Sequence, residues 1–197
     1  YWYIMGQTGS AQSFEAWGAA GDTPMPGDYD GDGKTDIAVY RAGTGYWWIY
    51  YSLTATYDSI SWGASGDKPV AADFDGDGQT DLGIVRWNAT NSIFDWYLYL
   101  SGGGTTTLSW GIGGDIPGAA DFDGDGKADV GMYRPGLDEY WWYGSSDAQA
   151  HGVSLNDGDV VVSSDYDGDG KADPAVFKSS TAYWYIHQST TNSLASV

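Results

Sequence analysis

The sequence predicts an all-β protein built from four repeated units, and two observations indicate this class. A nine-residue motif, Asp-Tyr/Phe-Asp-Gly-Asp-Gly-Lys/Gln-Thr/Ala-Asp, starts at Asp28, Asp73, Asp121 and Asp165, at spacings of 45, 48 and 44 residues. Between the motifs lie short runs rich in Val, Ile, Tyr and Trp, bounded by Gly, Asp, Ser and Thr, as is typical of strands. No segment carries a helical period of 3.6 residues over ten or more positions.

Each repeat reads as four short strands. In the first unit a Trp-Gly, Gly-Asp and Pro segment (17–24) precedes the motif (28–36), and an apolar run (37–41) and an aromatic run (46–50) follow it. Four-stranded antiparallel units of roughly 40–50 residues are typical of β-propeller blades. Side chains that are bulky on both faces of the aromatic run suit a blade packed between two neighbours. We therefore expect one propeller domain, residues 1–197, with units at about 17–61, 62–109, 110–150 and 151–197.

A fifth aromatic hairpin, at residues 1–16, exceeds the four units. Its opening run Tyr1-Trp2-Tyr3-Ile4 resembles Tyr183-Trp184-Tyr185-Ile186 near the end of the chain. An unpaired hairpin exposes a strand edge that can pair with another chain. Three arrangements would accommodate this extra hairpin: a closed ring with one displaced terminus, a segment of a larger propeller, or a hairpin donated to a neighbouring subunit.

The repeated motif has the chemistry of a calcium site. Calcium takes roughly 6–8 oxygen ligands, often Asp carboxylates and a backbone carbonyl, and the motif places carboxylates at positions 1, 3, 5 and 9 of a loop with two Gly residues that allow a tight turn. Magnesium fits less well because it demands near-octahedral geometry, and zinc is disfavoured with no Cys and only two His. We expect about four Ca²⁺ ions, held by the side chains of Asp28, Asp30, Asp32, Asp36, Asp73, Asp75, Asp77, Asp81, Asp121, Asp123, Asp125, Asp129, Asp165, Asp167, Asp169 and Asp173, and by the carbonyls of Lys34, Gln79, Lys127 and Lys171.

The residues that flank the loop distinguish it from other acidic calcium loops. An EF-hand would carry Glu at position 12 and flanking helices, whereas position 12 of the first copy is Val39, inside an expected strand. The unit from Pro26 to Tyr40 resembles an FG-GAP/VCBS repeat, as in integrin α-subunit propellers and many secreted bacterial proteins. The resemblance covers nearly the whole chain. It implies a β-propeller with calcium in the loop between the first two strands of each blade, and usually more than four blades. The fourth repeat departs most, with His151 and Val161 where Trp and Pro are expected.

Charge excludes several classes of partner. The formal net charge is −19, and the four loops hold 16 of the 27 acidic residues. Nucleic acid is a poor partner because its binding depends on Lys and Arg, and an anionic membrane surface is disfavoured for the same reason. No apolar run is long enough for membrane insertion. Four bound divalent ions would reduce the formal charge from −19 to −11.

No catalytic constellation is visible, so we do not expect an enzyme. Gly33-Lys34-Thr35 lacks the earlier Gly of a phosphate-binding loop, because that position is Asp28. His151 is interpreted as a packing residue at a Trp position. Most carboxylates are explained as metal ligands, which leaves Glu15, Asp138 and Glu139 without an assigned role.

A set of basic residues and a set of acidic residues each recur once per repeat. We interpret them as structural ion pairs or hydrogen bonds in preference to a ring of ligand-binding groups. The basic residues are Arg41, Arg86, Arg134 and Lys178, and the acidic residues are Asp22, Asp67, Asp115 and Asp159.

These observations favour a non-catalytic, calcium-stabilised extracellular module for adhesion, for binding a protein or glycan, or for assembly. Self-assembly of head-to-tail homo-oligomers through the terminal hairpin is the sharper form of this hypothesis, and deletion of residues 1–16 should then abolish the oligomer. The alternative is the propeller domain of a secreted polysaccharide-active enzyme, a lyase or glycosidase, or a lectin. Fold alone does not decide between them.

Overall fold

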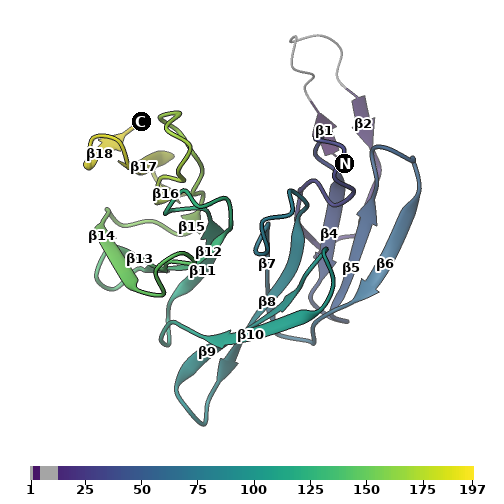
Figure 1. Ribbon diagram of the computed structural model, residues 1–197, viewed down its shortest axis with the longest axis horizontal. Coiled ribbons are helices and arrows are strands. Elements are labelled where there is room, and N and C mark those ends of the chain that lie inside the picture. Colours follow the sequence, from purple (N-terminus) through teal and green to yellow (C-terminus); the bar gives the residue numbers. More distant parts are fainter. Residues whose placement is uncertain (1, 5–12) are drawn as a thin grey trace.

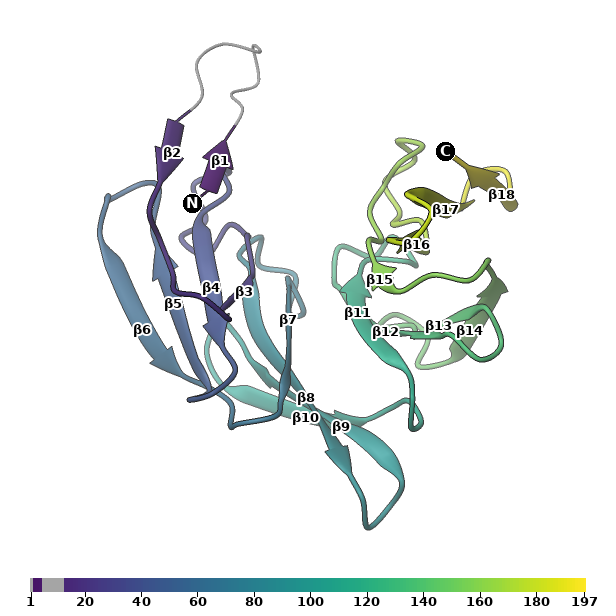
Figure 2. The same cartoon turned by 180° about the vertical axis from the view of Figure 1, so that it is seen from behind.

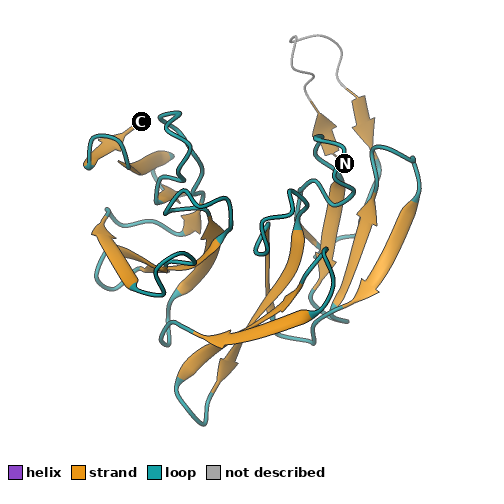
Figure 3. Ribbon diagram, viewed as in Figure 1, coloured by secondary structure: helices purple, strands orange, loops and turns teal. Residues whose placement is uncertain are grey.

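The computed structural model describes residues 2–4 and 13–197, and this part of the chain consists of strands and loops (Figure 3). Sixteen of its strands form four four-stranded antiparallel sheets, each with its strands in sequence order. The chain is thus an all-β, four-bladed propeller, as the sequence predicted. No helix in the described residues has the length and hydropathy of a membrane span.

The four blades follow one another along the chain (Figure 1). Within each blade the second strand pairs with the third, and in the first blade Tyr40 faces Trp47 and Val39 faces Trp48. Consecutive β-branched and aromatic residues favour these central strands. The blades comprise β3 (Thr23–Pro24), β4 (Ile37–Arg41), β5 (Tyr46–Tyr50) and β6 (Tyr57–Ser61); β7 (Lys68–Ala72), β8 (Asp81–Asn88), β9 (Ile93–Tyr99) and β10 (Thr105–Ser109); β11 (Ile116–Ala120), β12 (Asp129–Arg134), β13 (Glu139–Tyr143) and β14 (Ala150–Ser154); and β15 (Val160–Val161), β16 (Ala175–Lys178), β17 (Tyr183–Gln188) and β18 (Ser193–Ser196).

The blades surround a common centre. Residues from the innermost strand of every blade, or from its immediate flank, line one cavity of about 190 Å³, among them Met25, Val70, Gly118 and Val162. The second and third strands supply most of the residues that pack between blades. This arrangement places all four acidic loops at equivalent positions, because each loop joins the first strand of its blade to the second.

Three hydrophobic clusters join successive blades. One face of the first blade, with Tyr40 and Trp47, packs against Leu82 and Ile84 of the second. Equivalent clusters join the second blade to the third and the third to the fourth. The expectation that both faces of the aromatic strand are covered is met only in part: Trp96 and Tyr140 are fully buried in the inner blades, but Tyr99 and Tyr143 at the strand ends are exposed. In the fourth blade Trp184 is exposed as well. No cluster among the described residues joins the fourth blade to the first.

The predicted terminal hairpin is present in part. β1 (Trp2–Ile4) pairs with β2 (Ser13–Glu15), and the loop at 5–12 lies outside the described residues. Trp2 faces Glu15 just as Trp47 faces Ile60 in the first blade. By register, therefore, this hairpin corresponds to the third and fourth strands of a blade. Figure 2 shows it beside the first blade and away from the fourth.

Candidate metal centres

Each acidic loop is shaped by its first Asp. In the first blade the Asp28 carboxylate accepts backbone N–H groups from Gly31 (2.8 Å, Oδ1) and Gly33 (2.8 Å, Oδ2). Both glycines have positive φ values, 75° and 81°, a conformation that L side chains rarely adopt. The same pair of bonds recurs in the other three loops. The loop therefore wraps around its own first carboxylate, as the Gly spacing predicted.

Three carboxylates converge in every loop. Their oxygen atoms lie within 4.8 Å of one another, and no other group of three or more such ligands is found in the described residues. The second, third and fourth loops use positions 1, 3 and 9, whereas the first uses positions 1, 3 and 5. The clusters are Asp28, Asp30 and Asp32; Asp73, Asp75 and Asp81; Asp121, Asp123 and Asp129; and Asp165, Asp167 and Asp173.

The Asp at the ninth position of each loop is buried and joins two segments of its blade by hydrogen bonds, and it is also a potential metal ligand. Asp129, only 1% exposed, accepts the N–H of Phe122 at 2.9 Å on one oxygen and the N–H of Ser145 at 2.6 Å on the other. Asp36, Asp81 and Asp173 make the equivalent two bonds in their blades. Burial raises the pKa of Asp81 and of Asp129, because desolvation disfavours the charged carboxylate. A bound cation would offset that cost.

A serine that the sequence interpretation overlooked fastens each loop to the turn after the third strand. Ser145 donates its N–H to Asp129 and its hydroxyl to Asp125 at 2.9 Å. The residue that follows, Ser146, donates its N–H to Asp123 at 3.1 Å. The sequence did contain a signal for these contacts, because a Ser recurs once per unit within two residues of the end of the aromatic strand. The four are Ser52, Ser101, Ser145 and Ser189.

The Asp at the fifth position lies outside the carboxylate cluster in three of the four loops. Asp77, Asp125 and Asp169 accept hydroxyl hydrogen bonds from the serines of the turn. Asp32 also accepts the hydroxyl of Ser52, at 3.3 Å, and in addition forms an ion pair with Lys34 at 2.8 Å; this ion pair holds the pKa of Asp32 below its usual range. Ligation by the fifth position, and by the carbonyls of Lys34, Gln79, Lys127 and Lys171, stays a prediction.

The donor set fits calcium. Every converging atom is a carboxylate oxygen, the ligand that a hard cation prefers. Three like charges within 4.8 Å repel one another unless a cation or protons neutralise them. In the fourth loop, moreover, Oδ1 of Asp167 is buried without a hydrogen-bond partner, and a buried acceptor of this kind is costly unless something binds it. The loops thus supply both the ligands and a reason to bind a cation.

The recurring basic and acidic residues form structural ion pairs in three blades. Arg134 donates from Nε and Nη2 to the two oxygens of buried Asp115, each at 2.9 Å. Arg41 with Asp22 and Arg86 with Asp67 have the same bidentate geometry. These contacts confirm the structural interpretation for the first three blades. Asp22 has a lowered pKa because its partner is the Arg41 guanidinium.

The fourth blade departs from this pairing. Lys178 bonds Asp157 at 2.8 Å rather than the expected Asp159. Asp159 accepts the N–H and the hydroxyl of Ser179 instead, at 2.9 and 2.7 Å. A lysine lacks the planar two-pronged donor of arginine, so it does not impose the same geometry.

The assignment of His151 to the repeated Trp position was wrong. His151 lies within β14, opposite Trp142, and stacks on that ring at 5.4 Å while it contacts Asp147 at 2.9 Å. The counterpart of the Trp is Leu155, whose N–H donates to the Asp138 carbonyl at 2.7 Å, as Trp110 donates to Phe94 at 2.9 Å. Leu155 is buried in the cluster between the third and fourth blades. His151-Gly152 resembles the Trp-Gly pairs, but each Trp lies 11 residues before its motif (28 − 17, 73 − 62, 121 − 110), whereas His151 lies 14 residues before Asp165 and Leu155 lies 10 residues before it.

Comparison with protein families gives one match. The model described as FG-GAP-like repeat matches residues 28–84, a segment that contains the first two acidic loops and most of the first blade. A search of curated proteins found no match.

Proposed function

From an FG-GAP-like repeat at residues 28–84 within a four-bladed β-propeller, we propose that this protein is a calcium-stabilised, non-catalytic module for binding and assembly outside the cell. The observation that carries the proposal is the fourfold recurrence of one carboxylate cluster, each fastened to its blade by the same serine contacts. The proposed partners are a protein, a glycan or another copy of the chain.

Calcium would stabilise each blade by neutralising its carboxylate cluster. A ligand that binds only the folded state at a hundredfold its dissociation constant contributes about 2.7 kcal/mol per site. Domain stabilities are on the order of 5–15 kcal/mol, so four such sites would be a large share of the total. A fold that depends on bound calcium for its stability suits a compartment where calcium is abundant, since extracellular calcium-binding modules have dissociation constants of about 10⁻⁴–10⁻³ M.

The calcium loops also contact one another across blades. The carbonyl of Asp28, at the start of the first loop, accepts the N–H of Thr80, near the end of the second, at 2.6 Å. Asp73 with Ala128 and Asp121 with Ala172 repeat this bond at the same distance. Ordering one loop therefore also orders the boundary with the next blade. This chain of contacts supports a rigid platform, the property that a binding surface requires.

The experiment is calcium binding by titration calorimetry together with thermal melts in calcium and after chelation. We expect about four ions per chain and a melting temperature that rises with calcium. Asp73→Asn should reduce the number of tight sites by one because it removes the carboxylate that organises the second loop. Asp58→Asn, a change to an exposed Asp in β6 outside the loops, is the matched control and should leave binding intact.

A melting temperature independent of calcium in the wild-type chain would refute the proposal. Activity of the calcium-loaded protein on an acidic polysaccharide would do the same for its non-catalytic part. The terminal hairpin remains the sequence-based route to assembly, and its test is deletion of residues 1–16 followed by measurement of the oligomer mass.

A further inference from the structure

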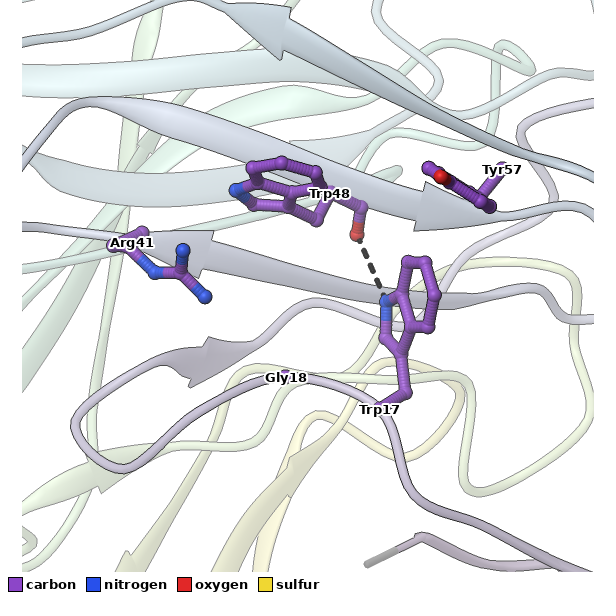
Figure 4. A pocket seen from close by; sticks show the side chains of 5 residues that line it. All are labelled: Trp17, Gly18, Arg41, Trp48 and Tyr57. Atoms are coloured by element: carbon purple, nitrogen blue, oxygen red, sulfur yellow. Dashed lines mark hydrogen bonds between the residues drawn. The ribbon is translucent and has the colours of Figure 1, made fainter.

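The first blade carries a pocket with three aromatic side chains in its wall. Its volume is about 380 Å³, within the range of about 300–1,000 Å³ that small-ligand sites occupy. Arg41 of β4, Trp48 of β5 and Tyr57 of β6 line the pocket together with Trp17 and Gly18 from the loop before β3 (Figure 4). None of these residues is a predicted metal ligand, so the pocket is separate from the acidic loop of the same blade.

The pocket is open only at the outer part of the blade face on which it lies. Ile37, Val39 and Arg41 alternate along β4 and therefore lie on one face of the sheet. Ile37 and Val39 are covered, with 7% and 3% of their surface exposed. Tyr57 lies in β6, the edge strand of the blade, and is 65% exposed. A small ligand can therefore enter from the β6 side without displacing the packed inner part of the face.

The aromatic wall is held in place by the fold. Trp17 donates its indole N–H to the Trp48 carbonyl at 3.3 Å, and its ring centroid lies 5.6 Å from that of Tyr57. Gly18, the next residue, has a positive φ of 88°, and an added Cβ there would lie 3.1 Å from Cγ1 of Val39. The rings are thus positioned before a ligand arrives, which reduces the entropy lost on binding.

Two hydrogen-bond donors of the pocket lack an acceptor among the described residues. Arg41 donates from Nε and Nη2 to Asp22, at 2.9 and 2.8 Å, which leaves Nη1. Nε1 of Trp48 is buried without a hydrogen-bond partner, and it lies on the side of the indole nearer to Arg41 (Figure 4). The guanidinium carbon is 5.5 Å from the centroid of the Trp48 ring. Since a buried unpaired donor is costly, an oxygen atom bound beside these two groups would be stabilising.

A ligand for this pocket must combine an apolar face with hydrogen-bond acceptors. The faces of aromatic rings are electron-rich and attract C–H groups, whereas guanidinium and indole groups only donate. A quaternary ammonium ion suits an aromatic cage, but it offers no acceptor and would meet the positive charge of Arg41. An acidic ligand is disfavoured by the net charge of −19, because Asp22 already neutralises Arg41. A neutral sugar has C–H groups on its ring faces and hydroxyl oxygens at its edge, so it meets both requirements.

The third blade shows which features are specific to this pocket. The repeat equivalents of four pocket residues line a cavity of about 260 Å³ there: Trp110, Gly111, Arg134 and Trp141. By register, however, Ala150 takes the place of Tyr57, and Ile93 of the preceding blade forms part of the wall. Trp141 also donates its indole N–H to Glu139 at 2.9 Å. The tyrosine wall and the unpaired indole of the β5 tryptophan are therefore features of the first blade, and the repeated packing does not require them.

We propose that the pocket of Trp17, Arg41, Trp48 and Tyr57 binds one neutral hexopyranose unit of a glycan. A ring face of the sugar packs against the aromatic side chains, and a hydroxyl oxygen accepts hydrogen bonds from Arg41 and Trp48. This inference rests on the proposed function, since it selects a glycan among the proposed partners and gives it a site.

The test is an NMR titration of the calcium-loaded, 197-residue chain with the methyl glycosides of glucose, galactose and mannose, followed through the indole N–H resonances. We expect at least one of these sugars to shift the Trp48 resonance, which Trp48→Phe identifies by its loss. Tyr57→Ala should weaken binding by roughly tenfold because it removes one ring of the wall. Tyr183→Ala, a change to a 50% exposed tyrosine of the fourth blade, is the matched control and should bind like the wild type.

The inference is overturned if none of the three glycosides shifts the Trp48 resonance. Equal affinity of Tyr57→Ala and the wild type also overturns it, because the sugar would then bind elsewhere. Tetramethylammonium chloride tests the other class of ligand, and binding of this cation in preference to the sugars would show a cation site instead. Melting temperatures with and without calcium separate the two proposals: a retained calcium effect without sugar binding contradicts only this site, and a lost calcium effect contradicts the proposed function.

Discussion

At the scale of the residue, the acidic side chains divide into three roles that look identical in the sequence. The first Asp of each motif holds the loop by its own Gly amides, the ninth is buried and joins the loop to a distant turn, and Asp22, Asp67 and Asp115 bind arginines. Two N–H groups of one arginine guanidinium donate hydrogen bonds to both oxygens of a buried carboxylate at once. The ion pairs should therefore contribute to stability, unlike exposed pairs.

Replacement of Arg134 tests this role. Arg134→Lys keeps the charge but loses the bidentate contact with Asp115, a carboxylate that is only 1% exposed. We expect the free energy of unfolding to fall by roughly 1–3 kcal/mol, the cost of an incompletely satisfied buried polar group. Urea denaturation in saturating calcium measures it. Asp58→Asn, a change to an exposed Asp outside the loops, is the control and should leave the midpoint unchanged.

The pH dependence of the first pair has a definite sign. The Arg41 guanidinium lowers the pKa of Asp22 from its ordinary value, so the folded state binds a proton at Asp22 less readily than the unfolded state does. The stability from this pair is present above the unfolded pKa, about 3.9, and is lost as pH falls through the lower folded pKa. The unfolding free-energy difference between wild type and Asp22→Asn should shrink over that range in acid titrations followed by thermal melts. A constant difference down to the most acidic measurement contradicts this account.

At the scale of the element, close packing limits the size of the side chains that the central strands of a blade can carry. Gly131 in β12 shows this limit: an added Cβ would lie 2.7 Å from the Tyr140 hydroxyl and 2.9 Å from Cε1 of the same ring. The equivalent positions of the first and fourth blades hold Ala38 and Ala175, both fully buried. The position of the Tyr140 ring thus leaves no room for a side chain at Gly131.

Gly131→Ala should destabilise the protein through this crowding. Overpacking a close-packed interior costs typically 1–3 kcal/mol, and we expect a loss of that order in the unfolding free energy. Gly136→Ala, in the neighbouring β12–β13 turn, is the control, because a Cβ there has no atom within 4 Å. Equal effects from the two changes would show that backbone entropy, not crowding at Tyr140, sets the result.

At the scale of the whole molecule, the loop-to-loop bonds join neighbouring blades through residues that are predicted to bind calcium. The N–H of Ala172 donates to the Asp121 carbonyl at 2.6 Å, and the Ala128 N–H donates to Asp73 in the same way. Both donors lie in acidic loops and both acceptors belong to predicted ligand residues. Loss of the metal should therefore loosen the boundaries between blades before it separates the strands within a blade.

Hydrogen exchange measures this coupling. We expect the amides of Ala128 and Ala172 to exchange slowly in calcium and much faster after chelation. Amides within the ladder between β12 and β13 should keep their protection under the same conditions, because their partners belong to one blade. If ladder and boundary amides lose protection together, calcium stabilises the fold globally and not at the boundaries.

The sequence by itself determined the local features: four units, their strands, the Gly-shaped loops and the loop carboxylates that cluster. These follow from short-range patterns, since strand alternation, positive-φ glycines and motif spacing act within a few residues. The Arg–Asp pairs could also be predicted from the sequence, because both partners recur once per unit. The serine contacts were missed, although they recur too, because an uncharged hydroxyl in a turn does not indicate a partner as an Arg and Asp of opposite charge do.

Only the tertiary structure decided which chemically equal residues are buried and which surfaces remain uncovered. Leu155 takes the Trp position, a correspondence that strand register reveals and sequence alignment concealed. Lys178 pairs with Asp157 although Asp159 keeps the 19-residue spacing of the arginine pairs. Trp47 and Trp184 occupy the same place in their repeats, yet one is buried and the other is exposed. Burial depends on whether another blade follows in space, and that is a property of the assembled molecule.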